Sequence, residues 1–345
     1  MRRMSQPILV FLILIASSVC VAQDAEKFAI ELTSASASKR DELLAAHPER
    51  ITIALRRELI QHGNLRFAST DYARALEIYQ LVEKIAEQIE DKEGLATAWL
   101  NIGSVYYFQG EYNHAIDHYR KAEAAFVALG NHLEVGRCRF GIALTHQSQR
   151  KPTEALKTFE EALKEFEAAR NTDEIANTVA SIGGLQYELG LYDDARKSFL
   201  RVAESSPGGE SLTRVAEVFY ALHDYSQALT YYLRALEYLK PQNSFGGMIA
   251  AYGGAANCYY YQRNYDKALE FYNLTLAIDR RTNDPTGIAT RLQSIGNVHR
   301  LRGDYASALE SYMSSLSIAE QSPPGATMAT TLGRSEEHTS ELQSH

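Results

Sequence analysis

A tyrosine-centred pattern recurs along the chain at nearly constant spacing, and it limits the possible folds more than any other feature of the sequence. Seven units share a pivot position, and five of the six steps between pivots are 40 residues long while the other is 33. Alanine lies three residues after every pivot, an aromatic residue lies seven after it, and Gly or Ala lies nine before it. The pivots are Tyr72, Tyr112, Pro152, Tyr192, Tyr225, Tyr265 and Tyr305. Such self-similarity predicts an array of stacked structural repeats.

Helix packing explains these offsets. Residues three, four and seven apart lie on one face of an α-helix. A small residue on that face lets a second helix approach closely, and the aromatic ring fills the space beside the contact. We therefore expect two antiparallel helices in each unit, helix A before the pivot and helix B starting at it. Gly110, Gly190 and Gly303 stand where the end of helix A needs a left-handed residue, and Asp224 and Asp304 can cap the next helix B.

The pattern resembles the tetratricopeptide repeat, most completely in the second unit. The matching residues there are Trp99, Gly103, Tyr106, Tyr112, Ala115, Tyr119 and Ala122. The departures in other units are Pro152 at the pivot and Val82, Val202, Thr275 and Ser315 at the last alanine. The resemblance covers about residues 48 to 319 and is to the long type with a 40-residue repeat. It implies an all-α fold, a right-handed superhelical α-solenoid of stacked helix-turn-helix repeats.

The repeat register also predicts the domain organisation. A seven-unit solenoid at 48–320 follows a helical lead-in at 23–47, in which 38–46 form a helix and Pro48 opens the next one. The motif at 289–292 recurs 40 residues later at 329–332, so we expect 321–333 to be the start of a truncated eighth repeat. The next small-residue position falls on Glu336. It lies within residues 334–345, which read as the translation of a short-read sequencing adapter. We interpret those residues as an artefact and the chain as a fragment.

The first 22 residues read as a signal peptide. Arg2 and Arg3 precede a largely apolar run at 8–19, and Val21 and Ala22 precede the expected cleavage before Gln23. Cys20 offers the alternative of lipidation, although Val19 stands before it where Gly, Ala or Ser is expected. We therefore predict an exported bacterial protein without a transmembrane span after cleavage. It would be periplasmic or extracellular, or alternatively a lipoprotein anchored at Cys20.

Composition and motifs argue against nucleic-acid binding and catalysis. The net charge is −8 and the pI is near 5.7, whereas nucleic-acid binders normally present a basic face. The sequence contains neither a Gly-rich phosphate loop nor a Gly-x-Ser-x-Gly elbow. We therefore predict no enzymatic activity, no cofactor and no nucleic-acid partner.

Two sets of chemically active side chains favour structural interpretations. His114 and His118 are four residues apart near Glu111, a spacing that can hold a metal, but a solvated helix face is the better interpretation. Cys138 and Cys258 lie three units apart, which exceeds disulfide reach in a stack of helices. We expect two buried free thiols and no metal site.

The remaining candidate is the surface lined by the helix A segments, which forms the concave wall of a solenoid. By analogy with the family, the groove-facing positions lie 15, 12, 8, 5 and 4 residues before each pivot. The residues that we predict to bind a partner are Arg57, Asn64, Tyr107, Tyr187, Tyr220, Asn257, Tyr260, Asn297 and Arg300. A tyrosine side chain gives a large contact area at a low cost in conformational entropy, and an asparagine side chain can form hydrogen bonds with the backbone of an extended peptide. The alternative is that several of these tyrosines only pack between units.

Two functions follow. The first is a non-enzymatic scaffold that binds a protein or peptide segment in the concave groove. In that case, replacing Asn257, Asn297 and Arg300 together should abolish capture without lowering the melting temperature. The alternative rests on residues 43–49, which, followed by a long-repeat array, resemble the front half of bacterial proteins that end in a caspase-like CHAT domain. The chain would then be the partner-binding part of an exported protease whose catalytic domain is missing from it.

Overall fold

Helix B begins at the predicted pivot in every unit of the computed structural model, which describes residues 23–321. The described part is all-α and holds no strand, so the predicted fold class is confirmed. The predicted signal peptide with Cys20, residues 322–333 of the predicted eighth repeat and the interpreted artefact at 334–345 lie outside it. The chain divides into two compact units, Met1–Thr178 and Val179–His345, with the division inside α9 (Thr172–Glu188).

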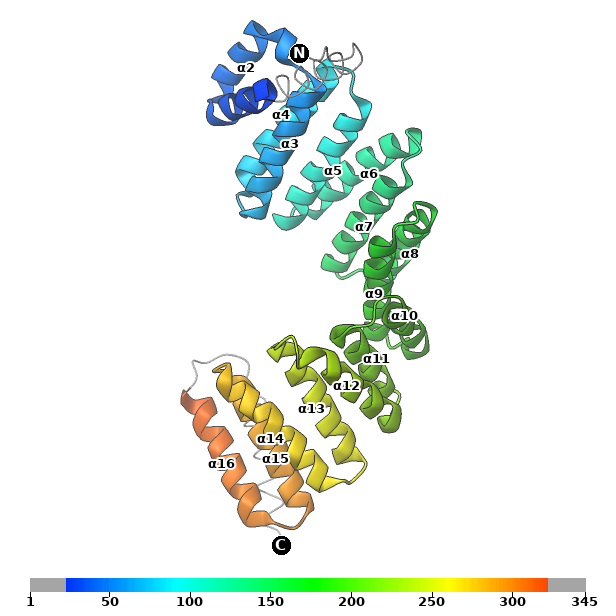
Figure 1. The fold of residues 1–345 in the computed structure, drawn as a ribbon, viewed down its shortest axis with the longest axis vertical. Helices are drawn as coiled ribbons and strands as arrows, with labels where there is room; N and C mark the ends of the chain where they lie inside the picture. Colours follow the sequence, from blue (N-terminus) through cyan, green and yellow to red (C-terminus); the bar gives the residue numbers. More distant parts are fainter. Residues whose placement is uncertain (1–22, 322–345) are drawn as a thin grey trace, which may run out of the picture. The chain divides into compact units, whose positions relative to one another are not determined.

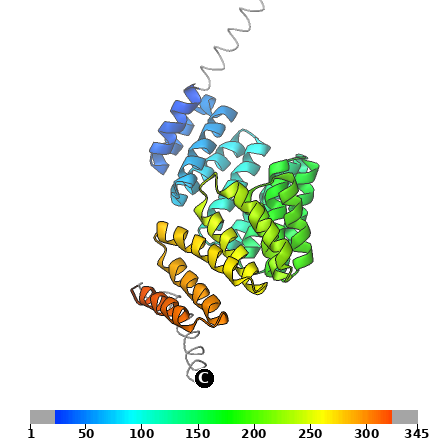
Figure 2. The same ribbon diagram turned by 60° about the horizontal axis from the view of Figure 1, so that its bottom comes forward.

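The first compact unit is a series of helical hairpins in which consecutive helices pack side by side (Figures 1 and 2). Its repeat helices are α3 (Ile53–Ala68), α4 (Tyr72–Gln88), α5 (Lys92–Phe108), α6 (Tyr112–Ala128), α7 (His132–Ser148) and α8 (Pro152–Ala168). Helix A and helix B alternate along this series, as the register predicts.

The lead-in covers the apolar face of the first repeat. Residues 23–34 are helical and are followed by α2 (Ala37–Ala46). Phe28 and Leu32 are fully buried in one cluster with Leu55 and Ile85 of the first hairpin. The lead-in therefore removes from water an apolar surface that a repeat at the end of an array would otherwise expose.

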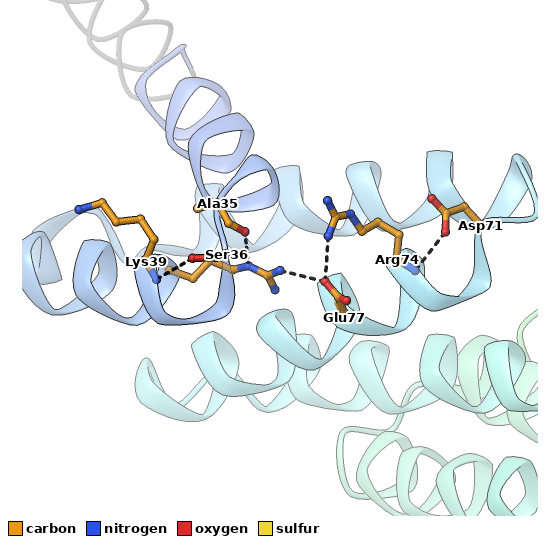
Figure 3. Close-up of polar contacts among 7 residues, drawn as sticks. Ala35, Ser36, Lys39, Asp71, Arg74 and Glu77 are labelled. Carbon is orange, nitrogen blue, oxygen red and sulfur yellow. Dashed lines mark hydrogen bonds and ion pairs between the residues drawn. The ribbon is translucent and has the colours of Figure 1, made fainter.

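Polar contacts join the lead-in to α4 (Figure 3). Arg40 donates to the carbonyl of Ala35 at 3.1 Å and to Glu77 at 2.9 Å, and Arg74 approaches the same carboxylate at 3.2 Å. The hydrogen bond from Arg40 lowers the pKa of Glu77. These contacts fix the lead-in against helix B of the first repeat.

The predicted helix start at Pro48 is wrong. Pro48 opens a single 3-10 turn, η1 (Pro48–Arg50), and α3 begins at Ile53. Thr52 has extended backbone, and its hydroxyl accepts a hydrogen bond from the amide of Leu55, which makes it the N-cap. A threonine cap with a side-chain hydrogen bond thus sets the helix start in place of the first-turn proline.

The second compact unit continues the same alternation. After the end of α9 its helices are α10 (Tyr192–Ser205), α11 (Gly209–Ala221), α12 (Tyr225–Leu239), α13 (Phe245–Tyr261), α14 (Tyr265–Arg281), α15 (Pro285–Leu301) and α16 (Tyr305–Gln321). The 33-residue step has a simple cause. Helices α10 and α11 are 14 and 13 residues long, whereas helices of the 40-residue units such as α6 and α14 have 17. The two shorter helices account for the seven missing residues.

Small residues and aromatic rings pack as the offsets predict. All seven alanines that follow the pivots are at most 2% exposed. The glycines nine residues before the pivots touch the ring of their own helix B, since a Cβ on Gly103 would lie 2.8 Å from Tyr119 and one on Gly296 would lie 2.6 Å from Tyr312. The close helix approach and the ring that fills the space beside it are therefore confirmed.

The turns between helix A and helix B all use a left-handed residue two positions before the pivot. Gly110, Gly190 and Gly303 have φ between 75° and 80°, as predicted. The other turns use side-chain-bearing residues with φ near 60°: Thr70, Arg150, His223 and Arg263. Asp224 and Asp304 accept hydrogen bonds from the amides of Gln227 and Ser307, so both predicted caps are confirmed.

The alanine contact gives the first prediction. Replacing Ala115 or Ala268 by Leu should destabilise the fold by about 1–3 kcal/mol, because the substitution adds further side-chain carbons at a fully buried position between packed helices. Chemical denaturation of the purified chain measures the change. The matched control is Ala124→Leu on α6, where the alanine is exposed and the free energy of unfolding should stay within error. Equal effects of Ala115→Leu and Ala124→Leu would contradict the packing.

Candidate partner-binding groove

Helix A segments of the first compact unit line an open groove of about 480 Å³. Its walls come mainly from α3, α5 and α7, with one ring from α6. Of the predicted binding residues in this unit, Asn64 and Tyr107 line the groove. Arg57 is exposed on α3 but is not among the lining residues. The structure therefore brings together two of the three predicted residues here.

The groove has an acidic end and an aromatic end. Glu93 and Glu134 lie in the first turns of α5 and α7, whereas Tyr107 and Phe108 lie at the end of α5. Arg137 is held between Glu134, at 2.7 Å, and Glu174, at 3.0 Å. Glu93 has no ion-pair partner among residues 23–321. Sequence reasoning missed these charges because it followed positions closer to the pivot.

A second hollow, of about 310 Å³, lies between α11 and α13 in the other compact unit. Charged residues of α11 form one side of it, and small residues of α13, including Gly247 and Ala250, form the other. The predicted binding residues of this unit do not line it. They are Tyr187, Tyr220, Asn257, Tyr260, Asn297 and Arg300.

The predicted tyrosines are half-buried in contacts with other rings. Tyr220 lies 5.6 Å from Tyr225 and 5.9 Å from Tyr261 between ring centroids, and Tyr225 stacks on Tyr261 at 5.0 Å. Tyr187 packs edge-on against Tyr192, and Tyr260 against Tyr261. Burial raises the pKa of Tyr187, Tyr220 and Tyr260. The contact of Tyr220 with Tyr261 of the next repeat agrees with the alternative that some of these tyrosines pack between units, whereas Tyr187 packs within its own repeat. The role of the tyrosines in binding stays a prediction.

The predicted asparagines accept hydrogen bonds from the aromatic position of their own repeat. The Tyr79 hydroxyl donates to Asn64 at 2.6 Å, and Tyr272 donates to Asn257 at 2.5 Å. Tyr312 donates to Asn297 at 2.7 Å in the same way. The guanidinium of Arg300 lies close enough to Tyr312 to oppose the rise in pKa that burial causes.

The pairing follows a rule that is visible in the sequence. Where helix B carries Tyr seven residues after the pivot, the residue eight before the pivot is polar, and in the second repeat Tyr119 donates to Ser104 at 3.2 Å. Where helix B carries Phe159 or Phe199, that residue is Leu144 or Gly184. The expectation that Asn257 and Asn297 can be replaced without a loss of stability must therefore be revised.

The thiols and histidines have local structural environments. Cys138 and Cys258 are buried and free, as predicted. Burial raises the pKa of Cys258 to about 12 and also raises that of Cys138, so neither is a thiolate nucleophile at neutral pH. His114 lies 2.9 Å from Glu111. Within residues 23–321 no group of three potential metal ligands comes together, and no helix there has the length and apolar character to cross a membrane.

Comparison with protein-family models gives two matches, both described as tetratricopeptide repeat. One covers residues 55–128 and 247–321, and the other covers residues 140–210 and 182–244. Together these ranges take in most of the chain and all seven pivots. The chain belongs to the tetratricopeptide repeat family. Proteins built from these repeats generally mediate protein–protein interaction and are generally non-catalytic.

Solved structures agree with this tetratricopeptide repeat fold. A signal transduction ATPase with numerous domains and a tetratricopeptide repeat sensor, from Pyrococcus horikoshii, has a TM-score of 0.65 and 15% identity over 84% of this chain and 49% of the ATPase. The C-terminal part of a repeat protein from Cytophaga hutchinsonii has a TM-score of 0.58 and 13% identity over 76% and 96% of the two chains. This chain thus spans about half the length of the ATPase. No curated protein sequence matches it.

The tyrosine–asparagine pair gives the second prediction. Asn257→Leu should destabilise the fold by about 1–3 kcal/mol, because it leaves the buried Tyr272 hydroxyl without its acceptor. The double variant Asn257→Leu/Tyr272→Phe should recover most of that loss, because it reproduces the natural Leu144 and Phe159 pair. A double-mutant cycle by chemical denaturation measures the coupling. Additive effects of the two substitutions would show that the hydrogen bond does not link the positions.

A buried carboxylate outside the groove gives the third prediction. The side chain of Asp279 is fully buried, and its Oδ2 lies 3.4 Å from Nε of Arg291. Burial raises the pKa of Asp279 in the folded protein, while Arg291 opposes the rise. The folded state therefore takes up a proton more readily than the unfolded state, and protonation between the ordinary and the folded pKa favours folding.

Lowering the pH from about 7 towards the ordinary pKa of 3.8 should thus raise the stability of the protein relative to the Asp279→Asn variant. Denaturation curves recorded across this range give the difference. Asp266→Asn is the control, because that side chain is 85% exposed and its substitution should leave the pH profile unchanged. A wild-type stability that falls relative to that of Asp279→Asn as the pH is lowered would contradict the assignment.

Proposed function

We propose that this tetratricopeptide repeat protein is a non-enzymatic scaffold that binds an extended protein or peptide segment along the groove formed by its helix A segments. The observation that carries the proposal is the open groove of about 480 Å³ in the first compact unit. Three successive helix A segments contribute to it, so a ligand that lies across them contacts several repeats at once. Such a surface suits a chain segment better than a small molecule.

The chemistry of the groove supports an extended segment. Thr97 and Asn101 of α5 contribute polar groups to the lining of the groove, which also includes the apolar side chains of Leu100 and Phe140. Side-chain amides can satisfy the backbone groups of an extended peptide, and the apolar residues offer places for its side chains. Tyr107 and Phe108 extend the apolar surface at one end, where Phe108 is 55% exposed.

The CHAT-type alternative stays a prediction that rests on residues 43–49. These residues lie in α2 and η1, and their structure contributes no further observation in its favour. The Pyrococcus ATPase does use its tetratricopeptide repeat as a sensor within a larger protein. A partner-binding array attached to a catalytic domain is therefore compatible with the groove proposed here. Export, and the lipid anchor at Cys20 as its alternative, form part of the proposal.

Selection from a phage-displayed library of random dodecapeptides on the immobilised chain tests the proposal. The enriched peptides should bind in the groove, and Glu93→Arg with Asn101→Ala should weaken them by at least about tenfold in fluorescence anisotropy. Both substituted side chains line the groove and neither makes a side-chain hydrogen bond within residues 23–321, so the melting temperature should hold.

The matched control is Glu160→Gln, which alters an exposed residue of helix α8 outside the groove. It should leave the peptide affinity unchanged. Peptides whose affinity responds to Glu160→Gln but not to the groove variant would overturn the proposed function. A selection that enriches no binding peptide would overturn it as well.

A further inference from the structure

The pairing between the ring of helix B and the residue eight before the pivot is altered in the fifth repeat. Tyrosine pairs with Asn or Ser in four other repeats, and phenylalanine faces Leu or Gly in two. In the fifth repeat the two positions hold Tyr232 and Glu217. Tyr232 is only 4% exposed, and its hydroxyl makes no hydrogen bond to any residue in the described part of the chain. The position that pairs with the tyrosine in those four repeats is here occupied by a charged residue that makes no hydrogen bond to the ring.

Glu217 is directed towards the hollow of about 310 Å³ between α11 and α13. Its carboxylate accepts a hydrogen bond from Arg214 Nη1 at 3.1 Å, one turn earlier on the same helix. It still lies near enough to Tyr187 and Tyr232 to add to the rise that burial causes in the pKa of both phenols. The hollow thus has the carboxylate of Glu217 in one wall.

The lining of the hollow carries more negative than positive charge. Glu210 and Glu217 contribute two carboxylates to its lining, and Arg214 is its single cation. The pair between Arg214 and Glu217 is solvent-accessible, since the arginine side chain is 54% exposed, and exposed ion pairs of this kind contribute little to stability. Arg214 can therefore leave Glu217 at small cost when a better-placed cation arrives. The Glu210 carboxylate makes no ion pair within residues 23–321.

The size of the hollow limits what it can accept. Sites for whole small molecules begin at about 300 Å³, so this hollow is at the lower end of that range. Gly247 and Ala250 have little or no side chain, so the wall formed by α13 lies close to the helix backbone and the space in front of it stays open. One long side chain of a bound segment fits this description. Acidic side chains are disfavoured by the two carboxylates.

We propose that the hollow binds the side chain of a lysine or arginine carried by the partner segment, with its cationic group between Glu210 and Glu217. The inference rests on the proposed function and specifies the chemistry of the partner. The carboxylates supply charge-assisted hydrogen bonds to such a cation.

Direct titration tests the site with a defined probe. Nα-acetyl-lysine amide should produce saturable shifts of the Tyr187 and Tyr232 ring resonances in tyrosine-labelled protein, and Nα-acetyl-norleucine amide should not. Glu217→Gln should remove the shifts, whereas Glu237→Gln, at an exposed residue of α12, should preserve them. Equal shifts from the lysine and norleucine probes would overturn the inference.

A second variant should have the opposite effect on the affinity for the lysine probe. Arg214→Gln removes the internal competitor for Glu217, so it should strengthen binding of the lysine probe several-fold. A merely structural role of the Arg214–Glu217 pair would give no such gain. A weaker or unchanged affinity in this variant, with an unchanged melting temperature, would contradict the exchange of cations.

Peptides selected on the full chain separate this inference from the proposed function. For peptides whose affinity falls on Glu217→Gln, replacing the lysine or arginine by norleucine should weaken binding about tenfold on the wild-type protein and have no effect on Glu217→Gln. A selection in which some peptides depend on Glu93 and Asn101 but none depends on Glu217 would overturn the inference and leave the proposed function standing. Loss of all groove binding would overturn both.

Discussion

The contact between a small residue of helix A and the aromatic ring of helix B is the constraint on which every repeat depends. A Cβ added to Gly103 would lie 2.8 Å from the Tyr119 ring, and one added to Gly141 of the next helix A would lie 2.7 Å from the same ring. One ring therefore fills the space within its own hairpin and also touches the following hairpin. Because interiors are close-packed, a change of ring size or helix separation at one repeat must be matched in its neighbour. This explains why the spacing rules hold in all seven units.

That constraint also determines how much of the fold the sequence can predict. Local rules that involve fixed offsets were sufficient for the helix B starts, the buried alanines and the glycine turns. The left-handed residues Thr70, Arg150, His223 and Arg263 escaped prediction, because a side chain at positive φ is unfavourable and nothing local marks it. Their conformation follows from the hairpin geometry, which requires the same turn at every repeat. Packing around the turn outweighs the local preference of the residue.

The groove was less predictable for a related reason. The register correctly places Asn64 in the groove, but it does not predict that Asn64 and Asn257 each accept a hydrogen bond from a tyrosine of their own repeat. In both cases the internal tyrosine hydroxyl takes the asparagine oxygen. The acidic lining by Glu93 and Glu134 lies further from the pivot, outside the positions that analogy selected. Comparing repeats with each other, rather than each with a family pattern, reveals the pairing from the sequence alone.

The same comparison explains how an array of structural repeats can acquire a specific function. The residue eight before the pivot lies beside both the ring of helix B and the groove. Asn64 lines the groove while its amide oxygen accepts the hydrogen bond of Tyr79, so this amide stabilises its own hairpin with an oxygen that is already engaged. The fifth repeat has Glu217 at this position. The hydroxyl of Tyr232 therefore lacks the hydrogen bond found in the other repeats with tyrosine, and a carboxylate lines the hollow instead. The fifth repeat therefore lacks the hydrogen bond that Tyr272 and Asn257 form in the sixth repeat. Specific recognition of a partner is therefore expected at repeats in which the tyrosine of helix B does not form a hydrogen bond with the residue eight before the pivot.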